Sequence, residues 1–325
     1  NGTELAISES QERMAVVIEA HEKEKFIKFC EAENIKAVEV AKVTDSGRMQ
    51  MFWNGQKIVD LSRAFLDTSG CAKKQDAKIS HLQEVNSNSI EFNEDNFYKI
   101  LAEKNTASQK GLVEMFDSTV GATTVALPFG GKYQTTETEG CVQTLPILNA
   151  ENIETVSYAS WGFDAEISKQ NSMVGASLAV VESVAKIVAM GGNFRNIRLS
   201  FQEYFEKLGN NPEKWGKPLA SLLGAYDAQM NLGLAAIGGK DSMSGTYQDI
   251  NVPPTLISFA CADGKKLNTI SPEFKKAGNF IYHFHHKTQE NGLPNYENLI
   301  EVFDYIYQGI QDKKIVSVKT IKDGG

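Results

Sequence analysis

The chain has 325 residues, of which 42% are hydrophobic and 23% charged, and its formal net charge is −8. That length suffices for about two domains of roughly 100–200 residues, so no disulfide or metal is needed to hold a core. An acidic protein repels phosphate backbones, which argues against a nucleic-acid partner. The four cysteines form no CxxC pair and no run of 18 apolar residues occurs. We therefore expect reduced thiols, a cytoplasmic location and no membrane span.

The region up to about residue 90 has the element order of an α+β unit. Predicted strands lie at 5–7, 14–18, 37–43 and 49–53, and a predicted helix lies at 23–33. Between the first two strands, Ser8–Arg13 carries two carboxylates among hydrogen-bonding side chains. Its residues Glu9, Gln11 and Arg13 could form a ligand-facing edge, and the alternative is a solvated hairpin connection.

A polar stretch from about residue 73 to 96 predicts a linker into a second unit. Beyond it, predicted helices lie at 94–104, 172–190, 200–208 and 218–232, and predicted strands at 122–127, 142–148, 153–161 and 252–262. The helix at 172–190 has the clearest periodicity, because apolar residues recur every three or four positions. After residue 264 we expect a strand at 280–284, a helix at 295–312 and a strand at 315–321. Both termini run into strand patterns, which we interpret as cuts through a longer chain.

The densest motif is Gly238-Gly239-Lys240-Asp241-Ser242. Two glycines allow backbone N–H groups to approach a phosphate, Lys240 adds positive charge, and Ser242 adds a hydroxyl. The spacing is not that of a P-loop. The alternative is a tight turn whose lysine points into solvent.

Glu182 lies within the apolar helix, where a carboxylate must be paired or bind a metal. One interpretation is a Mg²⁺ contact, and the alternative is a salt bridge to Lys186, four residues later. His283 and His285 would share a face of a strand, but no further ligand follows closely, so a surface strand end is favoured over zinc.

Eight segments carry a resemblance to a known family, and they occur in the family's order. They are Leu5–Met14, Phe116–Ala122, Pro128–Lys132, Gly175–Lys186, Phe201–Phe205, Trp215–Leu219, Gly238–Gly245 and Val252–Leu256. Through them, nearly the whole chain resembles the phosphoribosylformylglycinamidine synthase family in its large single-chain form. The strings Ser8–Met14 and Gly239–Met243 are the most specific of these matches.

The resemblance implies an α+β fold like that of aminoimidazole ribonucleotide synthetase, which the family contains in two copies. Residues 1–90 would end the first copy's C-terminal-type domain, and 91–264 would be the second copy's N-terminal-type domain, a half-barrel. Residues 265–325 would be the truncated start of the second C-terminal-type domain.

The implied activity is that of a glutamine- and ATP-dependent ligase of purine biosynthesis. ATP would activate the amide oxygen of formylglycinamide ribonucleotide, and ammonia from a glutaminase domain would then displace phosphate to give the amidine. The principal catalytic site would lie outside these residues, so we expect the isolated fragment to be inactive. Its partners would be nucleotide ligands, the remaining synthase and glutaminase domains, and a second copy of the fragment.

The family's second copy holds an auxiliary ADP–Mg²⁺ site. The resemblance assigns nucleotide or phosphate binding to Gly238–Ser242, Asp117 and Lys132, and metal binding to Glu182. Lys186 stands where the family often has an asparagine, and an aspartate expected near Gly131-Lys132 is missing. We therefore hypothesise that this branch fills the auxiliary site differently or leaves it empty. Two other functions stay open: a noncatalytic scaffold, and a stand-alone kinase-like relative of the same fold.

Overall fold

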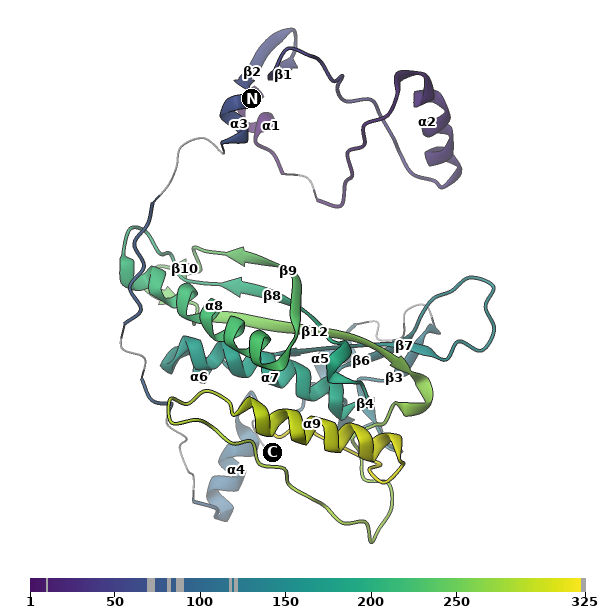
Figure 1. Ribbon diagram of the computed structural model, residues 1–325, viewed down its shortest axis with the longest axis vertical. Helices are drawn as coiled ribbons and strands as arrows, with labels where there is room; N and C mark the ends of the chain where they lie inside the picture. Colours follow the sequence, from purple (N-terminus) through teal and green to yellow (C-terminus); the bar gives the residue numbers. More distant parts are fainter. Residues whose placement is uncertain are drawn as a thin grey trace. The chain divides into compact units, whose positions relative to one another are not determined.

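The computed structural model describes residues 1–9, 11–68, 74–80, 83–85, 91–116, 119 and 122–322. The chain divides into two compact units, residues 1–74 and 75–325 (Figure 1).

The first unit is built around one antiparallel strand pair. Its elements are α1 (Gly2–Ala6), the 3₁₀ helix η1 (Ala20–Glu22), α2 (Lys23–Ala32), β1 (Arg48–Trp53), β2 (Gln56–Ser62) and α3 (Arg63–Asp67). The pair runs from Arg48 opposite Ser62 to Trp53 opposite Gln56. None of its side chains that the structure describes is buried. The described part of this unit therefore has little hydrophobic stabilisation of its own.

Sequence patterns predicted part of this unit correctly. The helix at 23–33 and the strand at 49–53 are confirmed as α2 and β1. The predicted strands at 5–7, 14–18 and 37–43 are wrong, since α1 covers most of the first and the other two have no regular structure. A strand needs a neighbour to bond with, and in the described part of this unit β1 and β2 pair only with each other.

The second unit contains most of the regular structure. Its helices are α4 (Glu94–Ala102), α5 (Lys110–Val113), α6 (Ala165–Gln170), α7 (Ser172–Ala189), η3 (Phe194–Asn196), α8 (Pro212–Leu232), η4 (Lys266–Asn268) and α9 (Tyr296–Gln311). Its main strands are β3 (Thr124–Ala126), β6 (Cys141–Thr144), β7 (Thr155–Gly162), β8 (Arg198–Tyr204), β9 (Ala235–Ser242) and β12 (Thr255–Lys265). Two small antiparallel pairs add β4 (Phe129–Gly130) with β5 (Thr136–Glu137), and β10 (Thr246–Tyr247) with β11 (Ile250–Asn251).

The six main strands form one sheet in the order β3-β6-β7-β12-β8-β9. β12 is antiparallel to both β7 and β8, whereas β8 and β9 are parallel. Parallel neighbours need a crossover connection, and α8 provides it between β8 and β9. The chain segment with α6 and α7 makes the corresponding connection from β7 to β8 (Figure 1). This topology places β9 at an edge of the sheet.

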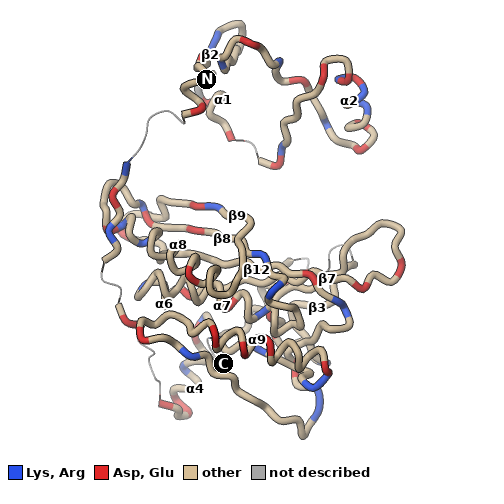
Figure 2. Tube along the Cα trace, viewed as in Figure 1, with Lys and Arg blue, Asp and Glu red and all other residues tan. Residues whose placement is uncertain are grey.

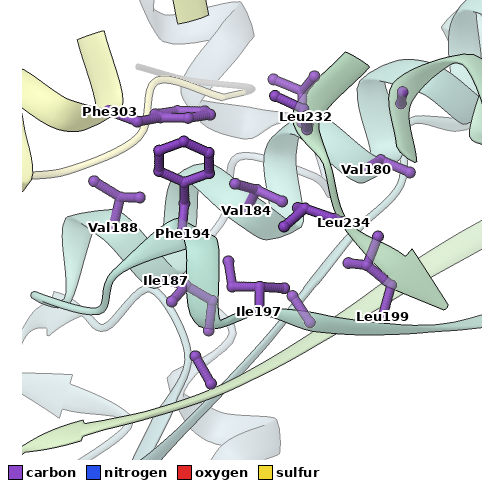
Figure 3. Close-up of a cluster of buried hydrophobic side chains, with 14 of the residues drawn as sticks. Val180, Val184, Ile187, Val188, Phe194, Ile197, Leu199, Leu232, Leu234 and Phe303 are labelled. Carbon is purple, nitrogen blue, oxygen red and sulfur yellow. The ribbon is translucent and has the colours of Figure 1, made fainter. Parts of the chain in front are cut away.

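The core lies between the sheet and α7, with α8 and α9 packed on α7. Val180, Val184 and Ile187 of α7 are fully buried, and Phe194 packs against Phe303 of α9 with ring centroids 5.6 Å apart (Figure 3). α7 is also the one described helix long and apolar enough to cross a membrane, but 78% of it is buried inside the protein. The apolar face of α7 is therefore used for the core.

Asparagine side chains begin the long helices. Asn171 Oδ1 accepts hydrogen bonds from the N–H groups of Met173 and Val174 at the start of α7, at 3.1 and 3.0 Å. Asn211 caps α8, which also has Pro212 in its first turn and ends at Gly233 with φ of 67°. These residues satisfy terminal backbone groups that a helix cannot bond internally.

Three predicted elements in this unit are wrong. Residues 198–204 form strand β8, where a helix was expected at 200–208, because Leu199 and Phe201 alternate with the more polar Arg198, Ser200 and Gln202. Residues 280–284 and 315–321 have apolar side chains suited to strands, yet both lack a strand partner among the described residues. The other predicted helices and strands that fall on described residues are confirmed, with ends that shift by several residues.

We predict that Gly224→Ala destabilises the second unit. A Cβ at Gly224 would collide with the backbone carbonyl oxygen of Met173, so α7 and α8 would have to separate. We expect a loss of about 1–3 kcal/mol in the free energy of unfolding, measured by urea denaturation. The matched control is Gly111→Ala, where a Cβ meets no atom within 4 Å. An equal loss in both variants would contradict the close packing of α7 on α8.

Candidate functional site

The motif Gly238–Ser242 forms the second half of the edge strand β9. Gly239 lies opposite Phe201 and Asp241 opposite Glu203 in the parallel pairing with β8. The tight-turn alternative is thereby excluded, since the backbone is extended over all five residues. The backbone N–H and C=O groups of an edge strand that point away from the sheet have no partner strand. Amide donors therefore remain available to a ligand.

The two glycines of the motif lie in different surroundings. A Cβ at Gly239 would lie 2.6 Å from the carbonyl oxygen of Phe201, so the close approach of β9 to β8 requires glycine there. At Gly238 a Cβ would meet nothing within 4 Å. Gly238 therefore faces open space, and Lys240 beside it is exposed.

Glu203 is a buried acid that the sequence patterns did not single out. It is only 2% exposed, and its Oε1 has no hydrogen-bond partner among the described residues. Burial, followed by the charge of Asp241 and a hydrogen bond with it, raises the pKa of Glu203 from 4.5 to about 8. The available signal was the alternation in β8, which puts Glu203 on the same face as buried Leu199.

Glu182 is held by Lys186. The Glu182 Oε1 and Lys186 Nζ atoms are 2.6 Å apart, and Lys186 also donates to the Trp161 carbonyl oxygen at 2.9 Å. The ammonium lies 4.5 Å from the centroid of the Trp161 ring, and Glu182 Oε2 accepts from the Phe163 N–H at 3.0 Å. The salt-bridge alternative for Glu182 is confirmed.

These contacts bear on metal binding at Glu182. Mg²⁺ requires several oxygen ligands in octahedral geometry, and Lys186 supplies a competing cation at one carboxylate oxygen. The described residues contain no group of three His, Cys, Asp or Glu side chains arranged to hold a metal. The residues present around Glu182 therefore do not fit a Mg²⁺ ion.

The Pro128–Lys132 segment borders a cavity of about 390 Å³. Gly130, Gly131, Lys266 and Ser271 are among its lining residues. Gly131 has φ of 82°, a backbone conformation that favours glycine. Lys132 is exposed, with its ammonium 5.3 Å from the centroid of the Tyr133 ring. Asp117 lies outside the described residues.

A larger cavity of about 570 Å³ lies beside α6 and the first turns of α8. At its wall, Glu206 is 5% exposed and accepts hydrogen bonds from Lys214 and Lys217. Burial acts to raise the pKa of Glu206, but the bonds from the two lysines hold it below its ordinary value. The three groups satisfy one another, so this wall is a structural ion cluster.

The β9 motif and Glu182 lie along one line of paired residues across the sheet, but on strands that are not neighbours. Gly239 is opposite Phe201, Phe201 is opposite Ser258, and Ser258 is opposite Gly162. A Cβ at Gly162 would lie 2.8 Å from the Glu182 Cβ. Three strand spacings of about 4.8 Å separate the two sites, which is roughly 14 Å.

The remaining candidates lie elsewhere. Glu9, Gln11 and Arg13 are exposed in the first unit, in a segment between α1 and η1 that forms no hairpin. The rings of His283 and His285 are 4.6 Å apart, and no third metal ligand joins them among the described residues.

Comparison with known proteins agrees with this architecture. The family described as "AIR synthase related protein, C-terminal domain" matches residues 1–54. Thermotoga maritima PurL in complex with ATP has a TM-score of 0.66 at 18% identity, and covers 95% of this chain and 46% of that one. The same protein in complex with FGAR has a TM-score of 0.67. By its fold, the chain is similar to AIR synthase-related proteins.

Sequence similarity then points to one enzyme of that class. Phosphoribosylformylglycinamidine synthase subunit PurL of Streptomyces avermitilis is 27% identical over 265 residues, which is 78% of this chain and 33% of the relative. PurL of Campylobacter jejuni is 22% identical over 320 residues, or 96% of this chain and 40% of the relative. The chain is thus similar in sequence to PurL, and it spans 33% to 40% of the length of these curated relatives.

We predict that Lys186→Ala destabilises the second unit. The change leaves Glu182 and the Trp161 carbonyl without their donor in a partly buried site, and we expect a loss of about 2–3 kcal/mol by urea denaturation. The matched control is Lys169→Ala, which breaks an exposed pair with Glu166 and should cost about 0.5 kcal/mol or less. Equal small losses would show that the Lys186 pair contributes no more than a surface pair.

Proposed function

We propose that the chain is part of a phosphoribosylformylglycinamidine synthase. The whole enzyme would be a glutamine- and ATP-dependent cytoplasmic ligase that converts formylglycinamide ribonucleotide to its amidine in purine biosynthesis. Similarity to PurL over 78% to 96% of the chain carries the proposal. The fold shared with PurL structures in complex with ATP and with FGAR supports it.

Within that enzyme, the chain would supply the second synthetase-like copy. Residues 1–90 would close the first copy, 91–264 would form the second half-barrel, and 265–325 would begin the next domain. The reaction would transfer the ATP γ-phosphoryl group to the substrate amide oxygen, and ammonia from a glutaminase domain would then displace phosphate. Because the principal site would lie in other domains, the isolated chain would have no ligase activity.

The nucleotide phosphates would bind to β9. The open space at Gly238, the outward backbone groups of an edge strand and the exposed ammonium of Lys240 support this role. Lys132 and the cavity beside Gly130 and Gly131 would contribute a second contact region. At Glu182 the lysine pair does not fit Mg²⁺, so nucleotide binding in this unit would proceed without a metal at that carboxylate.

We predict that the chain binds ADP, and that Lys240→Ala weakens the binding about tenfold, as expected for loss of one charge-assisted hydrogen bond. Isothermal titration calorimetry, with and without Mg²⁺, measures the effect. Mg²⁺ should leave the ADP affinity unchanged.

The control for this titration is Lys276→Ala, an exposed lysine outside the motif, which should bind ADP like the unmodified chain. No ADP binding by the unmodified chain would contradict nucleotide binding to this unit. Equal weakening by both substitutions would contradict the role of Lys240, and a strong requirement for Mg²⁺ would contradict the account of Glu182.

A scaffold role is compatible with this proposal, and the sheet supports it. Side chains that alternate with the buried ones face away from α7, and Trp161 and Phe259, which lie opposite each other, are 50% and 42% exposed. Tyr204 of β8 is 40% exposed. Exposed aromatic groups on one sheet face are typical of a surface that another domain covers.

We predict that the isolated chain self-associates at high concentration, as measured by multi-angle light scattering. Phe259→Ser should reduce the association, because it removes apolar area from the sheet face. The control is Phe280→Ser, at a side chain that is 86% exposed and lies outside the sheet. A stable monomer at high concentration would contradict association through this face.

A further inference from the structure

Two acidic side chains lie next to each other where β8 meets β9. Glu203 and Asp241 are opposite residues in the parallel pairing, so both project to the same side of the sheet. On its other side, Glu203 has Leu256 of β12 as its neighbour. In Figure 2 acidic segments of β8 and β9 lie side by side at this place. The pair therefore connects the proposed phosphate-binding strand to the interior of the sheet.

The surroundings of Glu203 favour its neutral form. A buried carboxylate normally collects hydrogen-bond donors, yet Glu203 Oε1 has none among the described residues. The neighbouring Asp241 is exposed and is an acceptor when ionised, and its charge opposes a second charge on the buried Glu203 beside it. One proton shared between them removes the repulsion and supplies the missing donor. Burial and Asp241 accordingly raise the pKa of Glu203 to about 8.

Other charged groups near this part of the sheet have partners of their own. Lys240 lies opposite Gln202, and residues at that position project to the other face. Among the described residues, Asp241 is the charged group that acts on the Glu203 pKa. On α8, Glu213 pairs with Lys78, and Lys214 and Lys217 pair with Glu206. Asp227 Oδ1 accepts a hydrogen bond from the Asn231 amide.

We propose that Glu203 is a positioning residue that, by sharing one proton with Asp241, fixes the edge strand β9 and with it the Gly238–Ser242 segment. The O–H of Glu203 donates to the Asp241 carboxylate, which ties the two strands together through their side chains. When the proton is lost, two carboxylates face each other and the outer strand loosens. The inference rests on the proposed function only where it assigns phosphate binding to β9.

The direction of the pH effect follows from proton linkage. The folded strand holds a proton that an open strand, with Glu203 at its ordinary pKa of 4.5, releases. The contribution of the pair is complete below the ordinary value, declines as pH rises, and is gone above about 8. The attachment of β9 to β8 should therefore weaken between pH 6 and pH 9. This interval contains the raised pKa of Glu203, about 8.

Hydrogen exchange of the β9 amides, corrected for the intrinsic pH dependence of exchange, tests this inference on the full chain. Between pH 6 and pH 9, the opening of β9 should increase about tenfold or more. In Glu203→Gln the increase should vanish, since an amide donates to Asp241 at both pH values. Asp241→Asn should reduce the increase, because burial still raises the Glu203 pKa but the charge of Asp241 no longer adds to it, and this second variant is used if the first does not fold. The control is Asp263→Asn at the end of β12, which should keep the increase.

Two results would overturn the inference. One is equal corrected exchange of β9 at both pH values in the unmodified chain. The other is the same pH-dependent increase in Glu203→Gln or Asp241→Asn. ADP titration separates this inference from the proposed function. Failure of ADP to bind would refute phosphate binding by β9, whereas the exchange data alone decide whether Glu203 and Asp241 hold the strand.

Discussion

The close seating of α7 on the sheet is the contact on which the second unit depends. Small residues make it possible, since a Cβ at Gly162 would collide with the Ala179 carbonyl oxygen. The hydroxyl of Ser160 donates to the Ser183 carbonyl at 2.6 Å, and Ser183 and Ser258 share a hydrogen bond of 2.9 Å. Polar groups at this buried interface are thus satisfied, while valine and isoleucine side chains fill the rest. The helix–sheet distance then sets the positions of α8 and α9, which pack on α7.

That seating also explains the chemistry around Glu182. With α7 so close to β7, the Glu182 carboxylate reaches the Phe163 N–H, and Lys186 reaches the Trp161 carbonyl. A lysine whose ammonium is enclosed by a carboxylate, a carbonyl and an aromatic face is a fixed internal cation. The Lys186 ammonium provides the positive charge beside the Glu182 carboxylate. In this respect the chain differs from the arrangement that its resemblance to the synthase family implies.

The edge strand β9 differs from the buried helix α7. It is exposed along most of its length and is held to the sheet by β8 alone. Exposure makes its backbone and Lys240 accessible, which suits ligand binding, but an edge strand with two glycines is weakly held. We propose that the buried Glu203 of β8 strengthens this weak attachment. The proposed binding strand β9 thus lies beside β8, which carries the side-chain anchor and is itself paired with β12.

The sequence by itself determined most helices and strands of the second unit and the family resemblance. The apolar periodicity of α7 and the glycine-rich motif were recognised from neighbours in the chain, because helix periodicity is a local property. Sequence patterns assigned β8 to a helix and left the role of Glu182 open. Tertiary structure decided these points, together with the pairing of Glu203 and Asp241. Strand pairing and burial depend on residues far apart in the chain: Asp241 is 38 residues beyond Glu203, and only the parallel register of β9 on β8 makes them neighbours.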